Sequence, residues 1–386
     1  MLLVGLFAWQ GAAHQTAWGA GHHLKLKLLT HSKPKNFVAV SADDEAVVSS
    51  RDNRYMVYGA GNSIFDTWGD RTYFVDTRTG KTRQLPISGN LRSLSDDGRT
   101  LLYAPQDDGL IDSHLYLFDT ATGAQAAIPE PPCDMTFCSV GNGRMTPDGQ
   151  SVSYVFSRSP SGSELPQASL HFWSASTGLL TAPTPPRYGS ELVLTPAGTV
   201  FYTAVCAVDT NAICVTRWDA ATSTTAQTNV GSESVAKPAK HCRGGLIAGL
   251  DGSPGGNLVI WSTVDPTCSR PQVISDWRWD VGAGDPTVVR RYSGERGQVQ
   301  GRQISDDGRE ARLTVVNHKG HGDFFETIDV TDSQGKKIQR LKQIDDNRII
   351  VNISGDGRNL LFVSDYNFVA SDHNRNSDIY ALRLPG

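Results

Sequence analysis

Short runs of alternating hydrophobic and polar residues recur along the chain, and each ends in a turn-forming group. The clearest are "TYFVDTRTG" ending at Gly80, "LYLFDTATG" ending at Gly123 and "LHFWSASTG" ending at Gly178. Alternation that includes aromatic and β-branched residues predicts half-buried strands. Asp or Ser opens each turn because its side chain can accept a backbone N–H two residues on, and Gly closes it at positive φ.

A second turn stands earlier in each unit, and two of its copies are the identical pentapeptide "SDDGR", Ser95–Arg99 and Ser305–Arg309. A short strand-like run follows every copy, such as "LLY" or "LLFVS". Copies spaced about 45 to 56 residues apart predict the blades of a β-propeller. The seven copies begin at Ser50, Ser95, Thr146, Thr195, around Asp251-Gly252 (a degenerate "GLDGS"), at Ser305 and at Ser354.

Each unit therefore predicts four strands, named A to D, with the S-x-D-G turn between A and B and the D-x-x-T-G turn between C and D. The fold class is all-β, a seven-bladed β-propeller of four-stranded antiparallel blades, over residues 21–386. The last unit stops after strand C, whereas Leu24–Thr30 is a spare strand ahead of the first unit. Pairing this strand with the last blade would close the ring and cover its edge. In the first blade, residues 36–50 offer two candidates for strand A.

The S-x-D-G turn, its following strand and the D-x-x-T-G turn resemble the TolB-like (WD-like) propeller repeat, which is also seen in the propeller of prolyl oligopeptidases. The resemblance covers nearly the whole chain after residue 20, although the Gly-His…Trp-Asp signature of WD repeats is absent. It implies a secreted, propeller-only protein. It is specific for the fold and says little about function. No G-x-S-x-G nucleophile elbow occurs in the chain.

Composition points to export. Residues 1–20 are typical of a signal peptide because Leu2–Trp9 is apolar and small residues follow; a disordered apolar tail is the alternative. Six cysteines without C-x-x-C spacing fit disulfides between nearest neighbours: Cys133, Cys138, Cys206, Cys214, Cys242 and Cys268. A net charge of −4 without a dense basic run disfavours nucleic acid or an anionic membrane surface. No later apolar run has the length of a membrane span, and we expect a monomer.

In such blades the B–C and D–A connections share one face, the loop face, opposite the regular turns. Irregular loops usually carry function, and polar or aromatic candidates there are Trp68, Asp70, Asp112, His114, His318 and His321. Inner strands carry Arg92, Arg144, Arg243 and Arg302, which we place near the upper, loop-facing end. Such arginines can hold a carboxylate or phosphate. Alternatively, they pair with Asp residues across blades and brace the ring.

Two loops have features of metal sites. Oxygen side chains at alternate positions resemble the first half of a calcium loop: Asp372, Asn374, Asn376 and Asp378. Ser377 stands where that loop has its Gly, and no Glu follows at the twelfth position, so a polar loop is the alternative. His318 and His321 could bind a transition metal, or they could be ordinary solvated loop residues. No cofactor is assigned on this basis, and calcium is the leading candidate.

These features favour a secreted, TolB-like propeller that binds a protein, peptide or glycan through its loop face and channel mouth. The alternative is a metal-assisted hydrolase or lyase with its active site at the channel mouth. An envelope-assembly module is a third interpretation. No residue is assigned a catalytic role.

Overall fold

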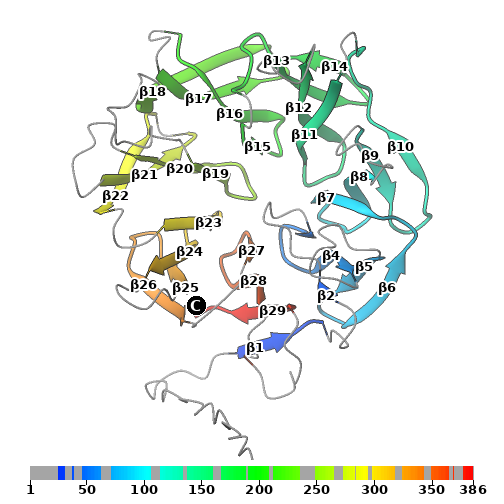
Figure 1. Ribbon diagram of the computed structural model, residues 1–386, viewed down its shortest axis with the longest axis vertical. Coiled ribbons are helices and arrows are strands. Elements are labelled where there is room, and N and C mark those ends of the chain that lie inside the picture. The colour runs from blue at the N-terminus through cyan, green and yellow to red at the C-terminus, as the bar shows by residue number, and fades with distance from the viewer. Residues whose placement is uncertain are drawn as a thin grey trace, which may run out of the picture.

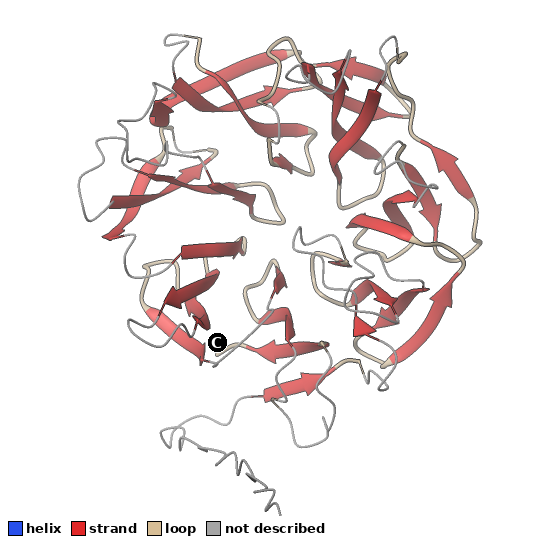
Figure 2. Cartoon of the chain, viewed as in Figure 1, coloured by secondary structure: helices blue, strands red, loops and turns tan. Residues whose placement is uncertain are grey.

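The computed structural model describes residues 25–30, 37–38, 46–61, 71–105, 114–133, 137–159, 167–187, 190–207, 212–234, 248–264, 273–282, 284–293, 298–317, 324–342, 349–364, 368 and 377–385. These residues form strands and turns, and none of them lies in a helix (Figure 2). The strands build seven antiparallel sheets arranged in a ring (Figure 1). The predicted seven-bladed β-propeller is confirmed.

Blades 1 to 4 follow the chain in order, with strand A nearest the centre of the ring. Blade 1 contains β2 (Phe37–Val38), β3 (Val47–Ser49), β4 (Tyr55–Gly61), β5 (Arg71–Asp76) and β6 (Lys81–Leu85). Blade 2 contains β7 (Gly89–Leu94), β8 (Thr100–Pro105), β9 (Tyr116–Asp119) and β10 (Gln125–Ala127). Blade 3 contains β11 (Phe137–Met145), β12 (Ser151–Ser159), β13 (Gln167–Ser174) and β14 (Gly178–Thr181). Blade 4 contains β15 (Leu192–Leu194), β16 (Thr199–Val205), β17 (Ala212–Asp219) and β18 (Thr224–Ser234).

Blades 5 to 7 complete the ring. Blade 5 contains β19 (Ala248–Gly252), β20 (Leu258–Val264), β21 (Val273–Asp280) and β22 (Thr287–Ser293). Blade 6 contains β23 (Gln298–Ile304), β24 (Glu310–Asn317), β25 (Phe324–Thr331) and β26 (Lys337–Lys342). Blade 7 contains β27 (Ile349–Ile353), β28 (Asn359–Ser364), β29 (Asp378–Arg383) and, from the other end of the chain, β1 (Lys25–Leu28). Both candidates for strand A of blade 1 are used, because β2 and β3 each pair with β4.

The repeated A–B turn is held by its own side chains. In blade 2 the Ser95 hydroxyl donates to Asp97 at 2.7 Å, and Asp97 accepts the backbone N–H of Arg99 at 2.9 Å. Ser95 Oγ also accepts the N–H of Thr100 at 2.8 Å, while Gly98 adopts a φ of 70°. Blade 1 has Asn53 in place of this glycine, at a φ of 60°, which Asn tolerates better than most residues.

The predicted A–B turn of blade 5 was wrong by a few residues. Asp251 and Gly252 belong to strand β19, and the turn is Ser253-Pro254-Gly255-Gly256. The N–H of Gly256 bonds the carbonyl of Ser253 at 2.8 Å, and Gly256 has a φ of 75°. The turn lacks the usual Asp at its third position, so its sequence no longer matches S-x-D-G although its hydrogen bonding does.

The N-terminal strand closes the ring as predicted. β1 pairs antiparallel with β29, with Lys25 opposite Arg383 and Leu28 opposite Tyr380, and lies at the outer edge of blade 7 (Figure 1). The chain continues past β1 so that Thr30 Oγ1 donates to the buried carboxylate of Asp378 at 2.7 Å. Sheet pairing and a buried polar contact therefore join the two ends of the chain.

Hydrophobic cores lie between adjacent blades, where the faces of neighbouring sheets meet. One core joins Phe201 of blade 4 to Trp261 and Trp279 of blade 5, and the rings of Phe201 and Trp279 meet edge to face at 5.4 Å between centroids. Trp277 stacks on Trp261 within blade 5 at 6.3 Å. These tryptophans serve packing between and within blades.

Candidate functional site

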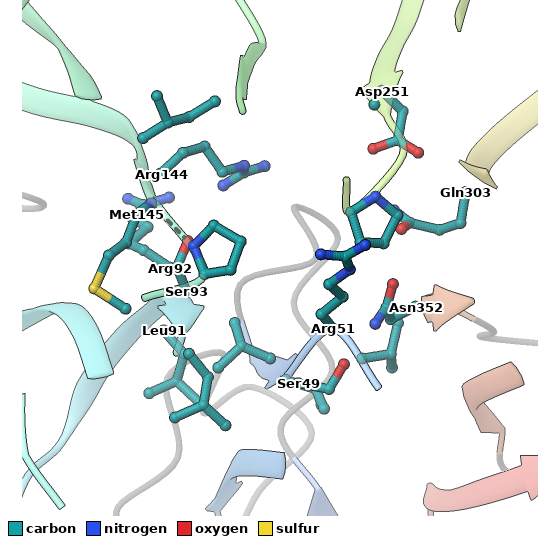
Figure 3. Close-up of a pocket in the computed structure, with 18 of the residues that line it drawn as sticks. Ser49, Arg51, Leu91, Arg92, Ser93, Arg144, Met145, Asp251, Gln303 and Asn352 are labelled. Atoms are coloured by element: carbon teal, nitrogen blue, oxygen red, sulfur yellow. Dashed lines mark hydrogen bonds between the residues drawn. The ribbon is translucent and has the colours of Figure 1, made fainter. Parts of the chain in front are cut away.

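The inner strands enclose a central cavity of about 300 Å³. Every blade contributes the residue two positions before the first residue of its A–B turn, and all seven of these residues line the cavity. We call this set the channel ring: Val48, Ser93, Arg144, Val193, Asp251, Gln303 and Asn352. Figure 3 shows Arg144 and Asp251 facing the cavity from β11 and β19. The ring thus combines one cation, one carboxyl group and several neutral polar side chains.

Local irregularities in the inner strands orient these side chains. Five inner strands have one extra residue relative to strand B. In four of them the shift falls directly before the channel-ring residue: Ser93, Arg144, Asp251 and Asn352. Such a bulge increases the local twist and redirects the next side chain. Arg92 is the extra residue of β7 and is buried in the cavity wall.

Arg144 is the exposed cation of the ring. Its Nη1 donates to the carbonyl of Gly143 at 3.2 Å, and within the described part of the chain no carboxylate lies within ion-pair distance of it. Its positive charge is nevertheless felt by two acidic groups, because it lowers the pKa of both Glu191 and Asp251. Most of the guanidinium donors therefore remain available to a ligand.

Asp251 is a carboxyl group with an unusual proton affinity. Burial raises its pKa to about 7, against the opposing effects of the Gly252 and Ile304 amides and of Arg144 and Arg302. Oδ2 accepts the N–H of Ile304 at 3.2 Å, which ties β19 to β23. A group that titrates near neutral pH in a cavity is a candidate functional residue.

Glu191 lies on blade 4, between Arg144 on blade 3 and Asp251 on blade 5. Burial also raises the pKa of Glu191, although its carboxylate accepts the N–H of Leu250 at 2.5 Å. Arg144, Glu191 and Asp251 thus place three charged groups on three consecutive blades, and two of them, Arg144 and Asp251, line the cavity.

At the turn end of the cavity, an ion pair joins two blades that are not neighbours. Arg51, in the turn of blade 1, reaches over the turn of blade 7 and pairs with Asp306 of blade 6 at 2.6 Å. The site it crosses is Gly355, where a Cβ would lie 2.8 Å from Asp306 Oδ2 and 3.1 Å from Arg51 Nε. Figure 3 shows Arg51 extending toward the middle of the cavity. We call this contact the turn clasp.

The predicted arginine sites differ from one another. Arg92, Arg144 and Arg302 lie two or three residues before the A–B turn, so they are close to the turn end of the channel and not to its upper, loop-facing end. Arg302 is a brace between blades: its Nε bonds Glu310 at 2.9 Å and its Nη1 bonds Ser262 at 2.8 Å. Arg243 lies outside the described residues.

Arg302 belongs to a buried charge cluster with Asp276, Glu310 and Arg312. Arg312 pairs with Asp276 of blade 5 and with Glu310, which links blades 5 and 6. Burial alone would raise the pKa of Glu310, but Arg302 and Arg312 hold it at about 2. The cluster fits the bracing alternative for Arg302.

Other predicted residues lie elsewhere. The exposed His114 has its Nδ1 3.1 Å from Glu130 Oε2, and Asp378 is fully buried against Thr30 at the start of β29. The remaining loop-face candidates lie outside the described residues: Trp68, Asp70, Asp112, His318 and His321. The same is true of the other calcium-loop residues, Asp372, Asn374 and Asn376, so that site stays a prediction. Among the residues that are described, no three His, Cys, Asp or Glu side chains gather as a metal site would require.

Two of the nearest-neighbour disulfides are confirmed. Cys133 bonds Cys138, and Cys206 bonds Cys214, each pair joining a connection to the strand beside it. Cys242 and Cys268 lie outside the described residues. Disulfides of this kind are consistent with an extracytoplasmic location. No helix among the described segments is long and apolar enough to cross a membrane.

The sequence interpretation missed Asp251, Glu191 and Arg51. Asp251 was taken for a turn residue because "LDG" imitates the S-x-D-G motif. A usable signal existed, since the position two before each turn recurs in every repeat and carries Arg144, Gln303 and Asn352 elsewhere. The turn clasp had no such signal, because it joins blades that are not neighbours.

Comparison with known proteins supports the fold. No protein-family model matches the sequence, and no curated protein matches it. Among solved structures, an oligogalacturonate lyase from Vibrio parahaemolyticus is similar over 94% of this chain and 97% of its own, with 12% identity and a TM-score of 0.60. The β-propeller domain of the Trilobed protease from Pyrococcus furiosus is similar over 91% and 94%, with 9% identity and a TM-score of 0.56.

A looser likeness is to a TolB of Agrobacterium tumefaciens, over 82% of this chain and 98% of that one, with 16% identity and a TM-score of 0.43. The oligogalacturonate lyase and the Trilobed protease domain are each less than 25% identical to this chain, so these two likenesses show a shared propeller architecture and nothing finer about activity.

Proposed function

We propose that this protein is an extracytoplasmic binding module whose ligand, a peptide, protein segment or glycan, enters the central channel and also contacts the loop face. One observation carries the proposal: the channel ring presents Arg144, with most of its donors unused, and the carboxyl group of Asp251 in a cavity of about 300 Å³. A concave site with a few convergent polar groups is the usual form of a binding site. The volume suits one end or one residue of a larger ligand.

Blocking the channel tests this proposal. Gln303 lines the cavity and Gln84 is exposed on β6 at the rim, so Gln303→Trp fills the channel whereas Gln84→Trp is a matched control. Peptide and glycan arrays would be probed with the unmodified protein and both variants. We expect Gln303→Trp to lose at least tenfold in affinity for the captured ligand, and Gln84→Trp to keep it. Equal binding by both variants would contradict a role for the channel.

A second candidate is an enzyme, a metal-assisted hydrolase or lyase. It is favoured by the pKa of about 7 of Asp251, because a general acid or base works best when its pKa lies near the working pH. The structural likeness to an oligogalacturonate lyase suggests polyuronates as the first substrates to try.

The test is release of unsaturated or reducing ends from polygalacturonate, with and without a chelator, by unmodified protein and by Asp251→Asn. Activity that falls at least tenfold both with chelator and in Asp251→Asn would favour the enzyme over the binding module. No product above the blank would remove this candidate for that substrate.

A further inference from the structure

Resting on the proposed binding role of the channel, we infer that the ligand presents a single carboxylate group to Arg144, and that a proton is taken up at the channel wall when it binds. The inference names both the chemistry of the ligand and a pH dependence of the same site. It is based on which side-chain hydrogen-bond donors in the cavity wall already have partners and which do not.

The donors favour an anion at Arg144. The other arginines of the cavity wall are engaged or buried, since Arg51 pairs with Asp306 and Arg92 is only 5% exposed. Arg144 is exposed and bonds one backbone carbonyl. A guanidinium has five N–H donors in a planar fork, which matches the two oxygens of a carboxylate. Gln303, on blade 6 of the same ring, offers a further amide, because the structure gives its side chain no hydrogen bond to any described residue.

The acidic neighbours decide which anion fits. Glu191 and Asp251 lie on the two blades that follow the blade of Arg144 around the ring, and both interact with its charge. A dianion such as phosphate would meet two carboxyl groups, while Arg144 is the one cation among the described cavity-lining residues that is exposed and has no ion-pair partner. A planar monoanion is repelled less and uses the fork better. The geometry therefore points to a carboxylate, carried either by a peptide C-terminus or by an acidic sugar.

The same neighbours couple binding to a proton. The charged groups that act on Asp251 are Arg144 from β11 and Arg302 from β23, and the Ile304 amide donates to it. Arg302 is already paired with Glu310, so it does not compensate a new anion. When a carboxylate binds Arg144, it competes for one of the two cations that stabilise ionised Asp251, and two like charges come close. Asp251 then binds a proton and can donate a hydrogen bond to the ligand.

The sign of the pH dependence follows from this coupling. Free Asp251 has a pKa of about 7, and a bound anion raises it further. Above that pH, Asp251 is ionised in the free protein but still protonated in the complex. Affinity therefore falls as pH rises above about 7, by at most tenfold per pH unit, and levels off below it.

Calorimetry with matched probes tests the inference. The carboxylate probes are acetyl-Ala-Ala with a free C-terminus and galacturonate; their neutral partners are the C-terminal amide and methyl galactoside. Inorganic phosphate is the dianion. We expect at least one carboxylate probe to bind at least tenfold more tightly than its neutral partner and than phosphate, and the pair that discriminates identifies the source of the carboxylate. In buffers of different ionisation enthalpy, binding at pH 8 should show net proton uptake.

Three variants locate the effect. Arg144→Met should weaken the preferred probe at least tenfold, whereas Arg78→Met, an exposed arginine in the C–D turn of blade 1, should not. Asp251→Asn should retain binding but lose both the proton uptake and the pH dependence, which a merely structural role would not do. Circular dichroism confirms that each variant is folded.

The inference fails if charged and neutral probes bind alike, if phosphate is preferred, if Arg144→Met binds normally, or if no carboxylate probe binds at 10 mM. Neutral probes that bind unmodified protein but not Gln303→Trp would overturn the carboxylate inference while leaving the channel-binding proposal intact.

Discussion

At the scale of single residues, the first Asp of "SDDGR" has a role that the other turns share only in part. Asp96 accepts the N–H of Arg51 from blade 1 at 3.0 Å, and its own N–H donates to Pro147 of blade 3 at 2.7 Å. Asp306 likewise accepts the N–H of Gly255 from blade 5 and donates to Gly355 of blade 7. Both copies therefore link their turn to the turns on either side.

Gly355 shows how much one missing side chain can matter. We expect Gly355→Ala to lower the free energy of unfolding by about 1 kcal/mol, because its Cβ would push against both partners of the turn clasp. Urea denaturation measures the change. Gly141→Ala is the matched control, since nothing lies within 4 Å of the added Cβ there. Equal effects of the two substitutions would mean that the clasp contributes nothing.

His171 is a buried residue with a clear acid sensitivity. It is 3% exposed, stacks on Tyr154 at 5.4 Å, and its Nε2 lies 2.8 Å from Ser169 Oγ. Burial lowers the pKa of His171 to about 4. The unfolded chain binds a proton near pH 6.5 and the folded chain does not, so stability is lost as pH falls from about 6.5 toward 4.

The variant His171→Gln cannot gain that proton. It should be less stable than unmodified protein at pH 7. The difference in free energy of unfolding between the two proteins should be smaller by about 2 kcal/mol at pH 4.5. Denaturant titrations at both pH values give the two gaps. His114→Gln, at an exposed position, should show no such narrowing. A constant gap for His171→Gln would contradict a neutral buried histidine.

At the scale of elements, the strands and turns could be predicted because the same pattern of residues recurs in successive repeats. The alternation in "LYLFDTATG" yields β9, and its Asp119 accepts the N–H groups of Ala121 and Thr122 at 2.9 Å. Prediction failed where the residue types of a turn changed although its backbone conformation stayed the same. In blade 5, Pro254 and Gly255 stand where blade 2 has Asp96 and Asp97, so the motif disappears although the turn remains.

The candidate site was predictable only in part. Arg144 was found because a charged residue on an inner strand is conspicuous, but its height in the channel was misjudged. The bulges before Arg144 and Asp251 depend on how strands A and B pair, and a single sequence does not specify that pairing. The pKa of Asp251 depends on its burial and on groups from other blades, such as Arg144 and Ile304, and no local sequence pattern records these.

At the scale of the whole molecule, the closure of the ring rests on a small buried contact as well as on strand pairing. Thr30 donates to the fully buried Asp378 at 2.7 Å and accepts the N–H of Ile379 at 2.9 Å. We expect Thr30→Val to lower the free energy of unfolding by about 2 kcal/mol, because a buried carboxylate loses a donor. Thr82→Val, exposed on β6, should change it little. Thermal and urea unfolding compare the two variants.

The turn links also differ around the ring. Pro147, Pro196 and Pro254 occupy the second position of their turns and have no N–H to donate there. Among the described residues, no hydrogen bond joins the A–B turn of blade 4 to the turn of either neighbouring blade. By contrast, the turns of blades 5, 6, 7 and 1 are joined in sequence, and Arg51 spans the last three of them.

This asymmetry has a mechanical consequence. A ring made from one chain is expected to be weakest at the seam where its two ends meet. Here that seam is fastened at the outer rim by β1 and at the inner rim by the turn clasp. Among the described residues, blade 4 has no hydrogen bond from its A–B turn to a neighbouring turn, and its inner rim is held by the bonds of Glu191 and Ser190 to blades 5 and 3 and by packing. Under mechanical load, the ring should therefore separate first at blade 4, across the ring from the closure, and not where the two ends of the chain meet.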